Sequence, residues 1–345
     1  MSTLRPTSTS ELAELLQSKP GPLRLRGGGS RLERMPATVA PARFLDLSAF
    51  AGIERLDAQD QTCTVGPGLP RAELDAALLA HRLELPCLGG GTIGGLFATD
   101  PIGPATVGGA SPRTLLLGMT AMLADGTRFQ SGARVVKSVA GFDVHKLFVG
   151  SRGTLFAGLQ LHLRLKPRPR AQAWFRREGL DLPAALECFS MLRSLVVPPA
   201  ELQLHRTANG CTIAGRIAGR DSFVRATMRA HELREGPPIT MHHLDASPGA
   251  EVVQGNVPGS RVPALLAMSP ANAPFLWHGG GRFELSLEAT TTTDKLLRTL
   301  PELQVDACIV RGDDSRRGLG TPLDPGQQHL AAGLKHALDP HGIFV

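Results

Sequence analysis

The sequence predicts an α+β fold in two domains, on the basis of three observations. The 345 residues are enough for two modest domains that each bury a core. In the first half, short strand and helix patterns are mixed, and a clear period-two strand ends at Pro167 and Pro169. In the second half, weak strands and helices follow one another without the βαβ repeats of a parallel sheet. We therefore expect one domain over residues 1–170 and a smaller α+β domain over 171–320.

The first domain opens with short elements of both types. Ser10 is expected to cap a short helix, because apolar residues follow it at helical spacing at Leu12, Leu15 and Leu16. Short strands are expected within residues 21–32, 43–48 and 61–68. A second helix is expected after Pro70, where helical spacing relates Leu74, Ala77, Leu78 and His81.

An antiparallel sheet is expected next. Asp125 and Gly126 supply turn residues within 114–132, so this segment should double back as a hairpin. Strict alternation follows in 159–169, where one face of the strand is formed by Leu159, Leu161, Leu163 and Leu165. Beyond residue 170, weak strands are expected at 210–219 and 281–290, and helices at 181–195, 220–234 and 326–338.

The composition narrows the classes of function. The net charge of +6 is spread along the chain, and no basic run is interleaved with aromatic residues, so a nucleic-acid partner is not expected. The five cysteines are far apart and include no C-x-x-C, which argues against a disulfide framework and against a zinc or iron–sulfur site. The most apolar stretch, 114–123, is half the length that a bilayer requires, so no transmembrane segment is expected. These features favour a soluble, cytoplasmic chain.

The segment CLGGGTIGG, residues 87–95, contains the G-x-G-x-x-G spacing of a Rossmann dinucleotide loop at Gly89, Gly91 and Gly94. Such a loop needs a buried strand before it and a helix after it. Pro86 closes the short apolar stretch before the glycines, and Pro101 argues against a normal helix after them. The surroundings therefore disfavour a Rossmann loop, although the spacing alone leaves it as an alternative.

Further glycine-rich turns occur in the same domain, at 26–30, 103–109, 139–143 and 150–155. Taken singly, each is typical of a tight turn between strands. Taken together, they could present many backbone amides to a long anionic cofactor, because glycine allows close approach and positive φ.

The order of these turns, together with the segment VVKSVAGFDVHKLFVGSRGTLFAGLQLHLRLKPRPRA over 135–171, resembles the vanillyl-alcohol-oxidase or PCMH type of FAD-binding proteins. Within that family the chain is most similar to the smaller FAD-binding subunits, or E subunits, of bacterial glycolate oxidases. The likeness covers residues 10–171 and returns at 322–344, whereas 172–320 is only loosely similar. The resemblance implies an FAD-binding domain of two α/β lobes over 1–170, a smaller α+β cap domain over 171–320, and a helix over 321–345 that returns to the first domain.

The resemblance also implies that FAD binds non-covalently, and it implies which residues bind it. The first loop of the family wraps the pyrophosphate, and in this chain it holds Arg26, Gly27, Gly28, Gly29 and Ser30. The T-I-G-G element runs along the pyrophosphate and flavin, and here it spans Gly91, Thr92, Ile93, Gly94, Gly95, Ala98 and Gly103. The remaining implied cofactor residues belong to two later loops and the strand beyond them, namely Ser138, Gly141, Asp143, Gly150, Ser151, Gly153, Thr154 and Leu159. Cys87 lies close to a loop where some relatives bond the flavin, but a buried free thiol is the favoured interpretation.

Catalytic residues stay unknown at this stage. Nearby positive charge favours a reduced flavin. The cations in or beside the matched loops are Arg113, Lys137, Lys146 and Arg152, and each of them could equally be a solvated charge.

A 2-hydroxy acid needs an arginine for its carboxylate and a base for its hydroxyl proton. The candidates for these two roles are His242, His243, His278 and Arg282. If they lie on a strand, His242 and His243 point to opposite sides and do not act as a pair. No metal site is expected, because no histidine pair or His/acid cluster has ligand spacing.

By resemblance, the chain is expected to be the FAD-binding subunit of a glycolate oxidase-like complex that oxidises a small 2-hydroxy acid. Its expected partners are a larger flavin subunit and an iron–sulfur subunit. The expected location is the cytoplasm, or the inner-membrane surface by attachment through these partners. Two alternatives remain open, namely a stand-alone FAD-dependent oxidase or dehydrogenase and a non-catalytic structural subunit of such a complex.

Overall fold

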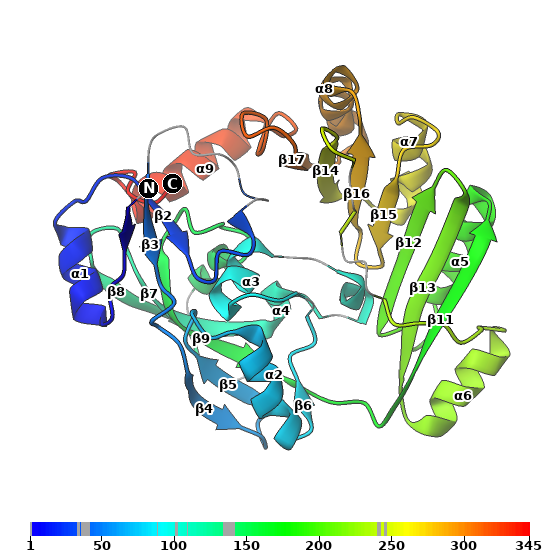
Figure 1. Cartoon of the computed structure of the whole chain (residues 1–345), viewed down its shortest axis with the longest axis horizontal. Helices are drawn as coiled ribbons and strands as arrows, with labels where there is room; N and C mark the ends of the chain where they lie inside the picture. Colours follow the sequence, from blue (N-terminus) through cyan, green and yellow to red (C-terminus); the bar gives the residue numbers. More distant parts are fainter. Residues whose placement is uncertain are drawn as a thin grey trace.

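Strands and helices are mixed throughout the computed structural model, which describes residues 2–32, 35, 42–87, 89–100, 103–108, 110–133, 142–239, 243–244 and 247–345. Within these residues the strands form four sheets (Figure 1). Two larger sheets lie in separate halves of the molecule, each with a core of its own. The predicted α+β fold class is therefore confirmed.

The larger sheet of the first half has five strands in the order β4-β5-β9-β7-β8, and neighbouring strands are antiparallel. Their bounds are β4 Ile53–Asp57, β5 Thr62–Val65, β7 Leu116–Met122, β8 Arg128–Gly132 and β9 Ala157–Arg164. The helical elements of this region are α2 Arg71–Ala80, α3 Ile93–Thr99, α4 Pro112–Leu115, and the 3₁₀ turns η2 Pro104–Gly108 and η3 Val144–Phe148. Two-residue strands β6 Leu83–Glu84 and β10 Lys166–Pro167 pair beside them.

Two sequence predictions for this sheet are confirmed. The leucines at 159, 161, 163 and 165 are buried, while the alternate residues 160, 162, 164 and 166 are partly or fully exposed. The hairpin of β7 and β8 turns at Gly126, whose φ of 84° suits glycine, and Asp125 Oδ1 accepts a hydrogen bond of 2.8 Å from the amide of Thr127. Alternation thus decides which face of β9 is buried, and the turn fixes the register of β7 against β8.

A small parallel sheet of β1 Thr3–Leu4, β3 Arg43–Asp46 and β2 Leu23–Arg26 lies beside the five-stranded sheet. Helix α1, Thr9–Gln17, buries Leu12 and Leu16 in the same region. Its cap is Ser8 rather than the predicted Ser10, since the Ser8 hydroxyl accepts a hydrogen bond from the amide of Glu11. The helix therefore begins two residues earlier than the leucine spacing indicated.

Helix α3 contradicts the expectation that no normal helix follows the glycines of 89–95. The side chain of Thr92 caps it by accepting from the amide of Gly95, and Asp100 ends it with a left-handed φ of 46°. Pro101 therefore limits the helix to seven residues but does not prevent it.

The second half is built on a seven-stranded antiparallel sheet of order β11-β13-β12-β15-β16-β14-β17. Its strands are β11 Ala171–Leu180, β12 Glu201–Thr207, β13 Gly210–Gly219, β14 Glu251–Asn256, β15 Phe275–His278, β16 Arg282–Leu287 and β17 Ala307–Arg311. The helical elements are α5 Leu182–Arg193, α6 Asp221–Ala230, η4 Gly259–Arg261, α7 Val262–Ala267, α8 Thr290–Thr299 and η5 Leu300–Leu303. The predicted helices at 181–195 and 220–234 correspond to α5 and α6.

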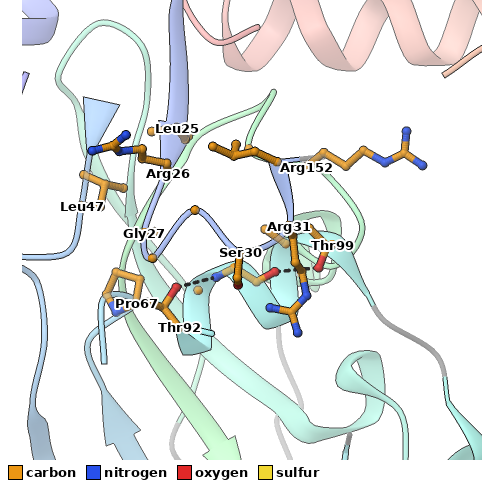
Figure 2. A pocket seen from close by; sticks show the side chains of 18 of the residues that line it. Leu25, Arg26, Gly27, Ser30, Arg31, Leu47, Pro67, Thr92, Thr99 and Arg152 are labelled. Carbon is orange, nitrogen blue, oxygen red and sulfur yellow. Dashed lines mark hydrogen bonds between the residues drawn. The ribbon is translucent and has the colours of Figure 1, made fainter. Parts of the chain in front are cut away.

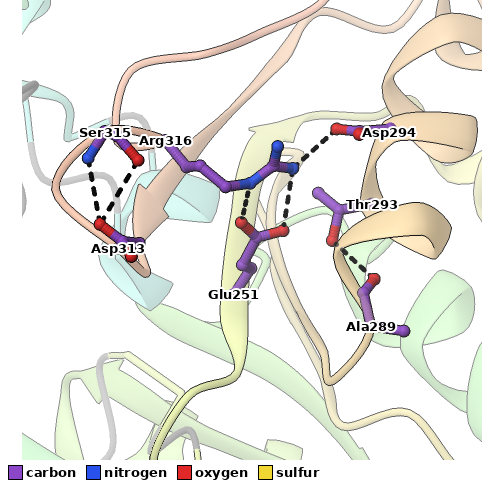
Figure 3. A network of polar contacts seen from close by, with 7 residues as sticks. All are labelled: Glu251, Ala289, Thr293, Asp294, Asp313, Ser315 and Arg316. Atoms are coloured by element: carbon purple, nitrogen blue, oxygen red, sulfur yellow. Dashed lines mark hydrogen bonds and ion pairs between the residues drawn. The ribbon is translucent and has the colours of Figure 1, made fainter.

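Arg316 ties the segment after β17 to this second sheet (Figure 3). Its Nε and Nη2 donate to the two carboxylate oxygens of Glu251 in β14, and Nη2 also reaches Asp294 Oδ1 in α8 at 2.6 Å. Glu251 is buried, so the two-pronged pairing compensates a carboxylate that would otherwise be costly there.

Helix α9, Pro325–Leu338, then carries the chain back beside the small sheet of the first half (Figure 1). Lys335 Nζ donates to the carbonyls of Thr154 and Phe344 and to Asp339 Oδ2, at 2.7, 2.6 and 2.6 Å. The buried Asp339 accepts from the amides of Ile343 and Phe344. The C-terminal tail thereby runs parallel to β2, with Leu23 and Phe344 bridged. Both ends of the chain thus pack against the same small sheet.

Candidate functional site

A cleft of about 690 Å³, including its open mouth, lies between the end of β2, the start of α3 and the turn after η3 (Figure 2). The residues that line it are Leu25, Arg26, Gly27, Gly28, Gly29, Ser30, Arg31, Leu32, Met35, Leu47, Pro67, Thr92, Gly94, Gly95, Ala98, Thr99, Phe148, Arg152, Gly153 and Gly158.

Two glycine-rich loops meet at close range in this cleft. A Cβ built on Gly27 would lie 2.4 Å from Thr92 Oγ1, and a Cβ on Gly91 would lie 2.5 Å from Ser30 Oγ. Gly91 also has a φ of 77°, which disfavours any side chain. Glycine is therefore favoured at both positions, because an added Cβ would overlap a side-chain oxygen of the other loop.

The backbone amides of the first loop are available to a ligand. No acceptor in the described part of the chain takes a hydrogen bond from the amides of residues 27–30. The Arg26 side chain is already engaged, because it pairs with Asp46 Oδ2 at 3.0 Å and stacks over the ring of Phe44. Burial alone would raise the pKa of Asp46, but hydrogen bonds from Ser48 and the Arg26 guanidinium outweigh it and lower that pKa. A run of free amides beside glycines is typical of an anion-binding nest.

Helix α3 is fixed to the wall of the cleft through Pro67. The amide of Gly94 donates to the Pro67 carbonyl at 2.7 Å, and a Cβ on Gly94 would lie 2.6 Å from Pro67 Cβ. The amide of Ile93 donates to Leu69 at 2.9 Å. These bonds and the burial of Ile93, Leu96 and Phe97 in the core of the first half hold this seven-residue helix in place.

The turn at 150–154 closes the far end of the same helix. The amide of Arg152 donates to the Ala98 carbonyl at 2.8 Å, and that of Gly150 to Phe97 at 3.2 Å. Gly153 has a φ of 78°, and a Cβ there would lie 3.1 Å from the Leu25 side chain. The turn therefore packs α3 against β2, and Figure 2 shows the side chains of Arg152 and Arg26 pointing in opposite directions across the cleft.

The structure brings half of the predicted cofactor residues to the cleft. Those that line it are Arg26, Gly27, Gly28, Gly29, Ser30, Thr92, Gly94, Gly95, Ala98 and Gly153. Those that do not line it are Gly91, Ile93, Gly103, Asp143, Gly150, Ser151, Thr154 and Leu159, while Ser138 and Gly141 lie outside the described residues. Which of these residues touch a cofactor stays a prediction. The main lining residues that the sequence did not suggest are Leu25, Leu47, Pro67 and Phe148, which carry no motif.

Of the predicted cations near a flavin, Arg152 lines the cleft. Lys146 is committed elsewhere, because its ammonium donates to the carbonyls of Arg113 and Leu116. Burial lowers the pKa of Lys146. Arg113 in turn donates to the Lys146 carbonyl at 3.1 Å, and Lys137 lies outside the described residues. Among the three candidates that the structure describes, Arg152 is therefore the one at the cleft.

A polar cluster adjoins the cleft where α3 meets the second sheet. Arg282 Nη2, at the start of β16, lies 3.6 Å from Oδ2 of Asp100, the residue after Thr99. Arg282 Nη1 donates to Gln254 Oε1 at 3.1 Å, and Gln254 Nε2 donates to Glu284 Oε1 at 2.8 Å. Burial raises the pKa of Asp100 and lowers the pKa of Arg282.

Glu284 also connects this cluster to a predicted histidine. His243 Nδ1 lies 2.8 Å from Glu284 Oε1, and the amide of Leu244 donates to Glu284 Oε2 at 2.8 Å. His243 lies in a bend, so the argument from opposite sides of a strand does not apply to it, and His242 lies outside the described residues. His278 is buried at the end of β15. The sequence spacing gave no sign that Glu284 pairs with His243, since the fold brings a bend and a distant strand together.

Three further observations concern a thiol, metal binding and membrane spanning. Cys87 is a buried free thiol, as predicted, and burial raises its pKa to about 11. Within the residues that the structure describes, no group of three His, Cys, Asp or Glu side chains is arranged to hold a metal ion. None of the described helices combines the length and apolar character needed to cross a bilayer.

Residues 2–132 match a family of sequences described as FAD binding domain. This chain contains an FAD-binding domain. The resemblance predicted from the glycine-rich loops and the expected FAD cofactor are thereby confirmed.

Proteins similar to the chain carry the names of flavin-linked oxidoreductases. Glycolate oxidase subunit GlcE of Escherichia coli K12 is 27% identical over 331 residues, which cover 92% of this chain and 89% of that protein. D-lactate dehydrogenase of Archaeoglobus fulgidus is 29% identical over 57% of this chain, and glycolate oxidase subunit GlcD of Bacillus subtilis is 26% identical over 58%. The chain spans less than half of the latter two proteins, with 46% and 44% of their lengths covered.

Solved structures of alkyldihydroxyacetonephosphate synthase share the fold of the FAD-binding domain and of the second half. One of them superimposes with a TM-score of 0.72 over 99% of this chain and 75% of its own chain, at 14% identity. At this identity the likeness supports the fold alone.

The cleft of the FAD-binding domain fits the cofactor. The amides of residues 27–30, which donate to no acceptor among the described residues, suit a pyrophosphate. The apolar side chains of Leu25, Leu47 and Phe148 offer surface for a ring system. These residues would hold FAD, and the polar cluster of Arg282 and Glu284 lies beyond the Thr99 end of the cleft.

Proposed function

We propose that this chain is the FAD-binding subunit of a glycolate oxidase-like complex and takes part in the oxidation of a 2-hydroxy acid. The cleft with its unpaired amides is the observation that carries the proposal, because it offers an anion nest within an FAD-binding domain. Bound FAD would supply the two-electron acceptor that such an oxidation requires. The match to GlcE along nearly the whole chain supports the choice of complex.

The proposed partners are a larger flavin subunit and an iron–sulfur subunit. The names of GlcE and GlcD, two subunits of glycolate oxidases that are both similar to this chain, support a multisubunit enzyme. The proposed location is the cytoplasm or, through these partners, the inner-membrane surface.

A second candidate function is that of a stand-alone FAD-dependent dehydrogenase. The cluster of Arg282, Glu284 and His243 favours it, because it places an arginine and a carboxylate-bound histidine next to the cleft. In the third alternative, a purely structural subunit, the chain would need neither FAD nor this cluster.

Two experiments separate these functions. Affinity purification of the tagged full chain from its native cell should bring down a larger flavoprotein and an iron–sulfur protein in fixed ratio. The isolated chain, reconstituted with FAD, is then assayed with glycolate or D-lactate and a dye acceptor. Turnover that appears only with the partners supports the subunit, and full turnover by the isolated chain supports the stand-alone enzyme. A chain that binds no FAD but still co-purifies with its partners and is needed for their turnover would leave only the structural role.

A further inference from the structure

A second cavity lies between the two halves of the molecule, apart from the cleft. Its volume is about 790 Å³ including its open mouth, and none of the described residues lines both the cavity and the cleft. Its walls come from α2, β6 and the segment after β10 in the first half, and from β12 and β13 in the second. Its charged lining residues are Arg71, Asp75, Glu84, Arg168, Glu201 and Arg216. Such a lining can recognise a ligand through charged groups.

Four of these charges are paired with one another. Arg71 Nε donates to Asp75 Oδ1 at 2.9 Å, and its two Nη atoms donate to backbone carbonyls at 2.6 and 2.8 Å. Arg216 Nε donates to Glu201 Oε1 at 2.7 Å. Two guanidinium groups thus balance two carboxylates.

Glu84 and Arg168 are the two charges left over. Neither side chain forms a hydrogen bond or an ion pair within the part of the chain that the structure describes. Lys166 pairs with Glu84 across β10 and β6, but its ammonium donates to the Gly108 carbonyl at 3.2 Å. The amide of Arg168 donates to the Arg82 carbonyl at 2.8 Å, so Glu84 and Arg168 are diagonal neighbours across this pairing. The cavity therefore presents an open carboxylate and an open guanidinium on adjoining backbone.

Glu201 supplies a third unmatched group. Its side chain is only 5% exposed, and its Oε2 is buried without a hydrogen-bond partner among the described residues. Burial raises the pKa of Glu201 in spite of Arg216, and the charge of Glu84 adds to this rise. A buried carboxylate oxygen without a donor is costly, and so is the repulsion from a second carboxylate. A positively charged donor at this place would relieve both.

An ammonium suits this place better than a metal ion. It carries three donors, so it can serve Glu201 and Glu84 together. In the described ranges of the chain, no three His, Cys, Asp or Glu side chains are arranged to hold a metal ion. The open guanidinium of Arg168 in turn matches a carboxylate.

We propose that this cavity binds a small zwitterion of the free amino acid type, with its ammonium between Glu84 and Glu201 Oε2 and its carboxylate on Arg168. Glu201 belongs to the second half of the molecule, and the other two residues belong to the first. The ligand therefore bridges the two halves and should raise the melting temperature of the chain. The proposal does not depend on the flavin or on the oxidation of a 2-hydroxy acid.

The test begins with the full chain as purified, whose melting temperature is measured with each of the standard amino acids in turn. The amino acid that raises it most is then titrated by calorimetry, together with its methyl ester and its N-acetyl derivative. The ester lacks the carboxylate charge and the N-acetyl derivative lacks the ammonium. Saturable binding of the amino acid is expected, with each derivative bound at least about tenfold more weakly.

Two variants assign the two ends of the ligand. Arg168→Gln should weaken binding of the amino acid about tenfold and abolish the preference over the methyl ester, while the preference over the N-acetyl derivative remains. Glu84→Gln should weaken binding similarly and reduce the preference over the N-acetyl derivative instead. Both side chains have no described partner to lose, so both variants should fold. Glu201→Gln keeps an oxygen for Arg216 and should weaken binding at least about tenfold.

Glu73→Gln and Arg170→Gln are the matched controls, because both side chains are exposed and neither lines the cavity. Their affinity for the amino acid should equal that of the wild-type chain. The proposal is overturned if none of the amino acids binds saturably, if the two derivatives bind as well as the amino acid, or if the controls weaken binding as much as Arg168→Gln and Glu84→Gln. Failure of the proposed function would instead appear as a chain that binds the amino acid in this pattern but neither binds FAD nor supports oxidation of glycolate or D-lactate.

Discussion

Gly27 and Thr92 touch across two loops, with only 2.4 Å between an added Cβ at position 27 and Thr92 Oγ1. Replacing Gly27 with alanine should therefore push the first loop away from α3 and disturb the amides that face the cleft. We expect Gly27→Ala to lower the free energy of unfolding by about 1–3 kcal/mol, as overpacking does. We also expect FAD affinity to fall at least tenfold, measured by fluorescence titration.

Gly28→Ala is the matched control for this steric effect. A Cβ at position 28 would meet Thr92 Cγ2 at 3.6 Å, which is ordinary contact. Its free energy of unfolding should stay within about 0.5 kcal/mol of wild type. Equal destabilisation by both variants would show that the close approach of Gly27 and Thr92 is not responsible.

Gly94 tests the attachment of α3. A Cβ there would lie 2.6 Å from Pro67 Cβ and 2.9 Å from its carbonyl oxygen, and backbone cannot move aside easily. We expect Gly94→Ala to lower flavin content per purified chain at least tenfold, measured from the visible absorbance. A Cβ at Gly90 would meet nothing within 4 Å, so Gly90→Ala should retain flavin. A fully flavinated Gly94→Ala protein would contradict the assigned role of this loop.

Asp339 organises the C-terminal tail. It is buried and accepts from two backbone amides and from Lys335. Asp339→Ala leaves these donors without a partner and should cost about 2–4 kcal/mol in denaturant unfolding. Gln328→Ala, on the exposed side of α9, should cost less than about 0.5 kcal/mol. Similar midpoints for the two variants would mean that the tail is not anchored through Asp339.

Buried thiols set an alkaline limit on stability. Burial raises the pKa of Cys63 to about 12 and that of Cys87 to about 11. Because the unfolded chain loses these protons at lower pH, their contribution is complete below the ordinary thiol pKa and is lost as pH rises through the folded values. The melting temperature should therefore fall between about pH 9 and pH 12. Cys63→Ala should reduce this fall, and an unchanged slope would exclude Cys63 as a cause.

Sequence patterns predicted strand β9 and the turn between β7 and β8 because interactions between residues close in sequence determine them. The alternation of Leu159 and Leu161 with polar neighbours, and the turn at Asp125 and Gly126, need no tertiary information. The sequence did not predict helix α3 because Pro101 argues against a helix at this point. The helix ends at Thr99, one residue before Asp100, whose backbone Pro101 restricts. The boundary of a short helix depends on its cap, here Thr92, and on the backbone that it meets.

The glycine loops of the cleft were predicted, but the rest of its surface was not. Leu47 and Pro67 come from other parts of the chain and carry no motif, so only the fold brings them to Gly94. The pairing of His243 with Glu284 was missed for the same reason, since it joins a bend to a strand far along the chain. An unpaired carboxylate oxygen such as Oε2 of Glu201 is likewise a property of packing and has no sequence signal.

The central claim is that this chain itself holds FAD in the cleft between residues 27–30 and α3. Equilibrium titration of the purified, flavin-free full chain with FAD, followed by flavin fluorescence, tests it most directly. Binding should be saturable and stoichiometric, weakened by Gly27→Ala and Gly94→Ala and retained by Gly90→Ala. The absence of a saturable change in flavin fluorescence with the wild-type chain, or equal FAD affinity of the wild-type chain and all three variants, would contradict it.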